Sequence, residues 1–226
     1  YTIIVHESRS FNMPKRSDNK LIALNYIKDQ IITCALPPGS VIRVEDIAAE
    51  LNFSKTPVRE ALLELQYENY VTIVPRKNTI VSPISLEDLN NIYEARLINE
   101  VALFKLLDIS DVSRSKDKLL ELVERWNSMN LSDKNKDTYK MFLREDLDFH
   151  ITLVNLSKNP YLSRFCKELL YKSQRFWYLA LHNNDLHSVR KEHLAILEAL
   201  LEYDFKKVSN LVEEHILNSR SVLNKL

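Results

Sequence analysis

Apolar residues recur at helical spacing over most of the chain, and the clearest case lies between residues 54 and 65. Four of them share one helix face at positions i, i+3, i+4 and i+7, namely Val58, Ala61, Leu62 and Leu65. Ser54 stands where a helix N-cap is expected, and Pro57 falls in the first turn, where its missing N–H costs nothing. The pattern predicts an amphipathic helix that begins at Ser54.

The polar side of this predicted helix carries its cations at the N-terminal end. Lys55 and Arg59 lie in the first turns with Ser54 and Thr56, although the helix dipole favours anions at this end. An anionic partner resolves the conflict, because phosphates accept hydrogen bonds from free N–H groups and Lys or Arg can reach base edges. We therefore interpret the stretch as a DNA recognition helix; a solvated basic helix end is the alternative.

The flanking segments predict a winged helix-turn-helix. Helical spacing recurs over 18–33 and 44–51, with a sharp break at Pro37–Gly39 between them. Beyond residue 70 the period changes to two, which predicts a small hairpin. The tip of this hairpin carries Arg76, Lys77 and Asn78. In such a fold one helix enters the major groove of DNA, and the wing contacts the backbone or the minor groove.

Beyond Ser85 the pattern is helical throughout, and no strand pattern is found. Six segments are predicted, over 86–107, 111–129, 132–156, 160–182, 186–203 and 205–226. The expected fold class is therefore mainly α, with an N-terminal winged helix-turn-helix followed by an all-α helical bundle. The expected domains are an N-terminal extension (1–17), a DNA-binding domain (18–82) and an all-α effector-binding and dimerisation domain (83–226).

Composition changes this picture only in part. The formal net charge of the 226 residues is zero, and residues 1–85 hold ten Lys and Arg against nine Asp and Glu, so DNA contact must depend on a local basic patch. Gly39 is the single glycine, which favours helices joined by short loops. No apolar run approaches the roughly 18 residues of a membrane span, and Cys34 and Cys166 form no CxxC pair. We expect a cytoplasmic protein with reduced thiols and no membrane contact.

Four polar residues of the predicted bundle lie on helix faces that otherwise point inward. Asp146 and His150 are four residues apart on one face, while His193 and His215 interrupt apolar stripes on two further helices. Each histidine alone reads as an ordinary core residue. Together, burial without partners would cost several kcal/mol for each group, whereas one divalent metal satisfies all four. Imidazole ligands favour Zn or Ni, with Co and Fe also possible, and the Asp146 oxygen keeps Mn possible.

Two arginines are candidates for binding a small ligand in the bundle. Arg96 lies on an inward face, where it needs an anion. Glu100, one turn further on, could supply this anion as a structural ion pair. Alternatively, the guanidinium could bind the carboxylate of a small effector with two hydrogen bonds. Arg175, close to Trp177, is a second candidate.

Residues from Leu21 to about Val81 resemble the GntR family of bacterial transcription regulators. The resemblance rests on residues 31–39, 47–51 and above all 54–62. Three positions depart from the family pattern: Lys55 replaces the usual Arg, Glu45 stands where many members have a DNA-contacting Arg, and Asn78 replaces the wing Gly. Lys lacks the bidentate fork of Arg, so the preferred base sequence is expected to differ, while Asn tolerates positive φ and should preserve the hairpin.

The second half is similar to the FadR-type C-terminal ligand-binding domain, known as FCD. The matching runs are 146–150, 157–162, 192–197 and 204–215. The resemblance implies that Asp146, His150, His193 and His215 hold a metal ion, as in the metal-binding members. It also implies that Arg96, in the context Tyr93–Arg96 followed by Glu100, faces an effector cavity. The helix count suggests the six-helix, VanR-like version of this domain.

These features together predict a ligand-responsive transcription regulator and not an enzyme. A homodimer would bind an inverted-repeat operator in double-stranded DNA, and a small organic acid would act as effector. One alternative is a constitutive DNA-binding protein with a purely structural metal. The other is a metal-dependent enzyme, because three His and a carboxylate also serve hydrolysis or oxygen chemistry. No further acid or base stands out near the set, which disfavours the enzyme.

Overall fold

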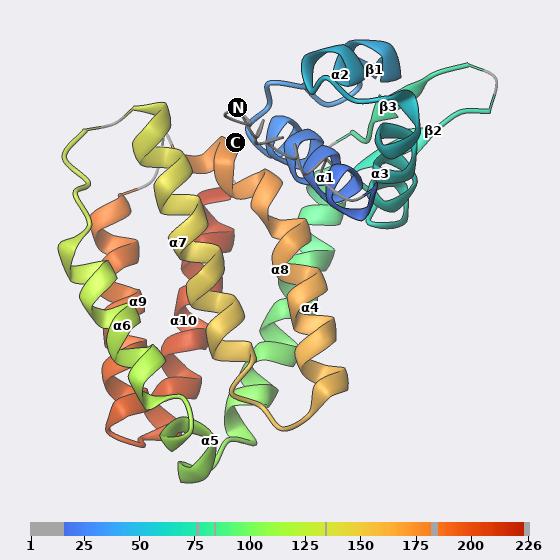
Figure 1. Ribbon diagram of the computed structural model, residues 1–226. Helices are drawn as coiled ribbons and strands as arrows, with labels where there is room; N and C mark the ends of the chain where they lie inside the picture. The colour runs from blue at the N-terminus through green and yellow to red at the C-terminus, as the bar shows by residue number, and fades with distance from the viewer. Residues whose placement is uncertain (1–15, 76, 84, 134, 182–184, 224–226) are drawn as a thin grey trace, which may run out of the picture. The chain divides into compact units, whose positions relative to one another are not determined.

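The computed structural model describes residues 16–75, 77–83, 85–133, 135–181 and 185–223. Within them the chain divides into two compact units, on either side of the boundary between Pro83 and residue 84. Figure 1 shows a small unit of helices with a short sheet and a larger unit made of helices alone. The predicted fold class, mainly α with a winged helix-turn-helix followed by a helical bundle, is confirmed.

The first unit places three helices against a three-stranded antiparallel sheet. Its elements are α1 (Arg16–Ile32), β1 (Val41–Ile42), α2 (Val44–Glu50), α3 (Lys55–Tyr67), β2 (Val71–Ile73) and β3 (Thr79–Val81). The strand order is β1-β3-β2, with Val41 opposite Ile80 and Val71 opposite Val81. The predicted hairpin of β2 and β3 is present, and β1 adds an edge strand that the pattern of the sequence did not predict.

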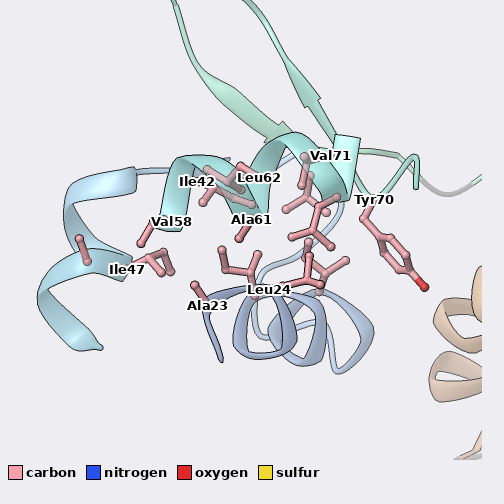
Figure 2. Close-up of a cluster of buried hydrophobic side chains, with 14 residues drawn as sticks. Ala23, Leu24, Ile42, Ile47, Val58, Ala61, Leu62, Tyr70 and Val71 are labelled. Atoms are coloured by element: carbon pink, nitrogen blue, oxygen red, sulfur yellow. The ribbon is translucent and has the colours of Figure 1, made fainter. Parts of the chain in front are cut away.

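The predicted apolar face of α3 is the centre of this unit's core. Val58, Ala61, Leu62 and Leu65 are each at most 1% exposed. Figure 2 shows the residues of α3 directed toward Ala23 and Leu24 of α1. Because one face of α3 is buried in this way, the opposite face and the polar residues of the N-terminal turn are left to solvent.

Tight turns between the elements use residues in the left-handed region. Asn52 (φ 55°) connects α2 to α3, and Asn69 (φ 64°) connects α3 to β2. Asn78, which was expected to preserve the hairpin by tolerating a positive φ, is not among the described residues that have one. The wing is closed instead by hydrogen bonds from the Val74 N–H to the Asn78 carbonyl (2.8 Å) and from the Lys77 N–H to the Val74 carbonyl (3.1 Å).

The second unit is a bundle of helices. They are α4 (Leu86–Lys105), α5 (Ile109–Ser113), α6 (Lys116–Ser128), α7 (Lys136–Val154), α8 (Pro160–Ala180), α9 (Leu186–Leu201) and α10 (Phe205–Leu223). Six correspond to the predicted segments, so the expectation of six helices omitted the five-residue α5. The segment 111–129 was predicted as a single helix, and this was wrong. A capping box between Asp108 and Asp111 starts α5 early, and the chain then turns at Ser115 before α6 begins.

Helices distant in sequence lie side by side in the bundle. Helix α4 packs against α8 and α10, α7 packs against α8, and α9 packs against α6 and α10 (Figure 1). The core between them contains large aromatic side chains, including Trp126, Phe142 and Phe149. This arrangement brings the inward faces of α7, α9 and α10 together. Among the described residues, no helix is long and apolar enough to span a membrane.

Candidate functional site

The polar residues predicted to contact DNA lie on the exposed N-terminal end of α3. Ser54, Lys55, Thr56 and Arg59 are all exposed, while Pro57 and Val58 between them are buried. Ser54 occupies the N-cap position, but its side chain makes no capping hydrogen bond. The first N–H groups of α3 are therefore not capped by this hydroxyl, which suits an incoming phosphate.

Lys55 has a partner that the sequence pattern did not predict. Its Nζ lies 2.7 Å from Oε1 of Glu45 in the first turn of α2, and both side chains are more than half exposed. The hydrogen bond from Lys55 holds the pKa of Glu45 below its usual value, with a smaller contribution from Arg59. An ionised carboxylate of α2 thus lies beside the cationic end of α3, at one of the positions where the chain departs from the GntR pattern.

The wing supplies further polar groups. Lys77 and Asn78 are both exposed at the turn between β2 and β3. Arg76, also predicted to contact DNA, lies outside the described residues. The wing therefore presents at least one cation to solvent at Lys77.

In the bundle, the four predicted metal ligands come together from three helices. His150 lies on α7, His193 on α9 and His215 on α10, and all three are buried. Nε2 of His215 lies 3.2 Å from Nε2 of His150 and 3.4 Å from Nε2 of His193. Oδ1 of Asp146 lies 3.6 Å from Nε2 of His193 and 4.0 Å from Nε2 of His150. The three imidazoles therefore converge, with ligand nitrogens within 4.8 Å of one another, and the Asp146 oxygen lies beside two of them.

The spacing of these atoms is that of ligands around one metal ion. Bonds of about 2.1 Å to imidazole nitrogen place neighbouring donors about 3.0 Å apart in an octahedron and about 3.4 Å apart in a tetrahedron. The two distances between Nε2 atoms match this range, and the Asp146 oxygen lies slightly further out. Three imidazoles could thus hold a divalent ion, and one carboxylate could complete the set if the Asp146 side chain moves toward them.

The electrostatics of the cluster also suit a cation. Burial raises the pKa of Asp146 to about 6, and its Oδ1 has no hydrogen-bond partner among the described residues. Burial, together with nearby positive charge, lowers the pKa of both His150 and His193 well below 6.5. At neutral pH these imidazoles keep their lone pairs, and the buried carboxylate needs a positive partner.

The surroundings of the three imidazoles differ. Nδ1 of His215 lies 2.7 Å from Oε2 of Glu192, a residue that the sequence reasoning missed. The His193 ring stacks on Phe149, with centroids 3.9 Å apart and planes at 21°. Nδ1 of His150 lies 4.0 Å from Oε2 of Glu100, which is beyond a hydrogen bond. Glu192 begins the run 192–197 that resembles the FCD domain, but neither this run nor its position before His193 carries information about a partner on α10.

Arg96 and Glu100 form a buried ion pair beside the cluster. Nε of Arg96 lies 2.6 Å from Oε1 of Glu100, and both side chains are 1% exposed. The structural ion pair considered for Arg96 is therefore present. Its Nη1 is buried with no hydrogen-bond partner among the described residues, so Glu100 does not use the whole guanidinium. Arg175 is buried on α8 and takes part in interactions there.

Comparison with known families matches both units. The model of the bacterial regulatory proteins of the gntR family matches residues 23–81, and the FCD domain model matches residues 91–218. The HTH-type transcriptional regulator BphR of Paraburkholderia xenovorans (strain LB400), described as uncharacterized, is 26% identical over 205 residues, which cover 88% of this chain and 82% of the relative. The gluconate operon transcriptional repressor of Bacillus subtilis (strain 168) is 24% identical and covers 83% of this chain and 82% of the relative.

Solved structures share the fold. A GntR transcriptional regulator from Rhodococcus sp. RHA1 has a TM-score of 0.70 at 20% identity, over 92% of this chain and 98% of that chain. McbR/YncC of E. coli has a TM-score of 0.66 at 20% identity, over 92% and 97% of the two chains. The FCD match alone spans more than half of the chain. The chain therefore belongs to the GntR family of bacterial transcription regulators, with a DNA-binding GntR domain and an effector-binding FCD domain, and it is not an enzyme.

Proposed function

We propose that the FCD domain of this regulator holds a divalent metal through Asp146, His150, His193 and His215, and that a small carboxylate effector binds there. The observation that carries the proposal is the convergence of three buried imidazoles, with a buried carboxylate oxygen 3.6 Å from one of them and 4.0 Å from another. Zn or Ni is the expected ion, because borderline imidazole ligands predominate, while Co, Fe and Mn remain compatible with the donor set.

Charge balance favours an anionic effector. With three neutral imidazoles and one carboxylate, a divalent ion keeps a net positive charge in a desolvated site. The Arg96 charge is balanced by Glu100, but Nη1 of Arg96 remains available as a hydrogen-bond donor. A small organic acid could bind the metal on one side and Arg96 on the other. One relative is named for the gluconate operon, and gluconate is such an acid.

The thermal melt of the chelated full-length protein tests this proposal. Added Zn or Ni should raise Tm, and small organic acids should raise it further only when the metal is present. The double variant Arg96→Met/Glu100→Gln should keep the metal response and lose the acid response. The two changes are made together because Arg96→Ala alone would leave Glu100 buried without its cation, at a cost of about 3–5 kcal/mol. Co, Fe and Mn are tested in the same way. If none of the five ions changes Tm, the histidines are ordinary core residues and the metal proposal fails.

We further propose a homodimer that pairs through the FCD domain and binds an inverted repeat. Large apolar side chains are exposed on α4, at its C-cap and on α8, two helices that pack against each other: Ile98, Leu106, Tyr161 and Phe165. An exposed apolar surface of this kind is typical of a protein interface. Ile98→Asp should yield monomers in sedimentation, whereas Leu120→Asp on α6 should not. A wild-type protein that sediments as a monomer at high concentration would exclude the proposed dimer.

Constitutive DNA binding with a structural metal is the remaining alternative. It agrees with the buried site equally well, because a metal that only stabilises the bundle needs the same donor atoms. Operator affinity measured with and without a panel of small organic acids separates the two. If the protein is ligand-responsive, one of the acids should change the operator affinity of the metal-loaded protein. If the metal is purely structural, the operator affinity should be the same with and without the acids.

A further inference from the structure

We infer that Glu192 is a positioning residue for the metal site, because its carboxylate holds His215 in the one tautomer that can bind the ion. The inference rests on the proposed metal function. Oε2 of Glu192 lies 2.7 Å from Nδ1 of His215, which is hydrogen-bond distance. An ionised carboxylate only accepts hydrogen bonds, so the proton of a neutral His215 ring must be on Nδ1. The lone pair is then on Nε2, the atom that faces His150 and His193.

Glu192 is itself fixed by the helix that carries His215. Its second oxygen, Oε1, accepts a hydrogen bond of 2.9 Å from Nδ2 of Asn218. His215 and Asn218 are three residues apart on α10 and therefore share a face. Both oxygens of a residue on α9 are thus held by α10, which sets the distance and the rotation of the His215 ring across the interface of the two helices.

The other two histidines depend less on a carboxylate. The plane of His193 is set by its stacking on Phe149, and Trp126 contacts its edge with centroids 4.4 Å apart. Glu100 is too far from His150 to hydrogen-bond, and Arg96 already binds it. Among the described residues, Glu192 therefore makes the one carboxylate–imidazole hydrogen bond of the cluster. Such a bond fixes the tautomer and raises the basicity of a ligating imidazole.

Zinc affinity of the full-length protein tests this role. Zn²⁺ binding is measured by competition with a chromophoric chelator for wild type, Glu192→Ala, Glu192→Gln and Asn218→Ala. Glu192→Ala should weaken binding about 10- to 100-fold, as the loss of such a partner does at other metal sites. Glu192→Gln keeps an acceptor oxygen and should recover part of the loss, and Asn218→Ala should show a smaller loss in the same direction. Glu198→Gln, an exposed residue of α9, is the matched control and should bind as wild type.

Two further measurements separate positioning from mere structure. The metal-free melting temperature of Glu192→Ala should stay near that of wild type, because the side chain is 27% exposed. Two-bond ¹H–¹⁵N NMR spectra of the metal-free protein should show His215 protonated at Nδ1 in wild type and mixed tautomers in Glu192→Ala. If wild type binds zinc and Glu192→Ala binds it equally well, the positioning role is wrong while the metal site stands. If wild type binds no divalent ion, the proposed metal function fails and the inference fails with it.

Discussion

The two units of this regulator use polar side chains in opposite ways. In the first unit, Lys55, Arg59 and Lys77 are exposed, and the core beneath them is apolar. In the second unit, the polar residues Asp146, His150, His193 and His215 are buried within the core itself. One site is thus a surface supported by a core, and the other is part of a core.

Because of this difference, binding and folding stability should be independent in the first unit and coupled in the second. An exposed cation contributes little to folding, because water already solvates it and surface ion pairs are worth about 0–1 kcal/mol. A buried polar group without a partner costs much more, so a ligand that satisfies it also stabilises the fold. Substitutions at the end of α3 that is predicted to contact DNA should therefore change DNA binding alone, whereas substitutions in the histidine cluster should change ligand binding and stability together.

The largest effect is expected for His193→Ala. The ring is 0% exposed and stacked on Phe149, so its loss removes one of the proposed metal ligands and leaves a cavity. The zinc-dependent rise in Tm, which corresponds to about 4 kcal/mol at a thousandfold excess over Kd, should disappear. His187→Ala, an exposed residue of the same helix, is the control and should keep it. Salt-dependent binding to non-specific DNA should persist in both variants; its loss in His193→Ala would contradict the separation of the two units.

The second largest effect is expected from low pH, which should reduce the folding stability of the metal-free protein. The pKa values of His150 and His193 are lowered in the folded protein. As pH falls below 6.5, these two histidines are therefore protonated in the unfolded state and not in the folded state, which favours unfolding. Asp146 has the opposite effect on stability, because its pKa is raised to about 6 in the folded protein. Between about pH 4 and 6 it binds a proton in the folded state alone, which favours folding. Two protons outweigh one, so the metal-free protein should be less stable at pH 5 than at pH 7.

The affinity for the metal should also fall as the pH is lowered. The ion needs Asp146 ionised, so zinc affinity should fall about tenfold per pH unit below pH 6 from this residue alone. Melts with zinc and with chelator at pH 5 and pH 7.5 measure both effects. A zinc-induced rise in Tm that is the same at both pH values would contradict the buried-carboxylate ligand.

Substitutions of the exposed cations on α3 and in the wing should weaken DNA binding without destabilising the fold. Arg59→Ala and Lys55→Ala should each weaken operator binding by about 1–3 kcal/mol if the side chains reach base edges. Lys77→Ala should weaken all sequences alike and reduce the salt slope by about one. Lys28→Ala, whose Nζ contacts Glu68 beyond the other end of α3, loses the same charge and is the control for DNA binding only, because its side chain is 16% exposed and lies over Tyr70. Operator titrations by fluorescence anisotropy, with melts of each variant, test the expectation that Tm stays nearly constant.

The smallest effect is expected at Glu45. Glu45→Gln removes a carboxylate near the phosphates and releases Lys55, so affinity for DNA should rise by about 0.2–1 kcal/mol. Glu50→Gln, at the other end of α2, makes the same charge change away from Lys55. Anisotropy at several salt concentrations measures the difference between them. Weaker binding by Glu45→Gln to one particular sequence would instead show that the carboxylate accepts a hydrogen bond from a base.

The sequence predicted best what a single helix determines. The buried face of α3 and the inward positions of Asp146 and His150 follow from helical spacing alone. The short strand β1 has too few residues to display a period, and α5 was merged with α6 because its boundary depends on a local capping box. The contacts of Glu45 with Lys55 and of Glu192 with His215 join different helices, so no spacing along one helix could predict them.

The distribution of the histidines over three helices also sets an order of events during protein synthesis. The core of the first unit is complete once Val81 has left the ribosome, whereas the cluster needs His215 on the last helix. At about 5–20 residues per second, the interval between them is on the order of ten seconds. During this time the nascent chain has a DNA-binding unit that can fold, while the domain that would regulate it is still being made.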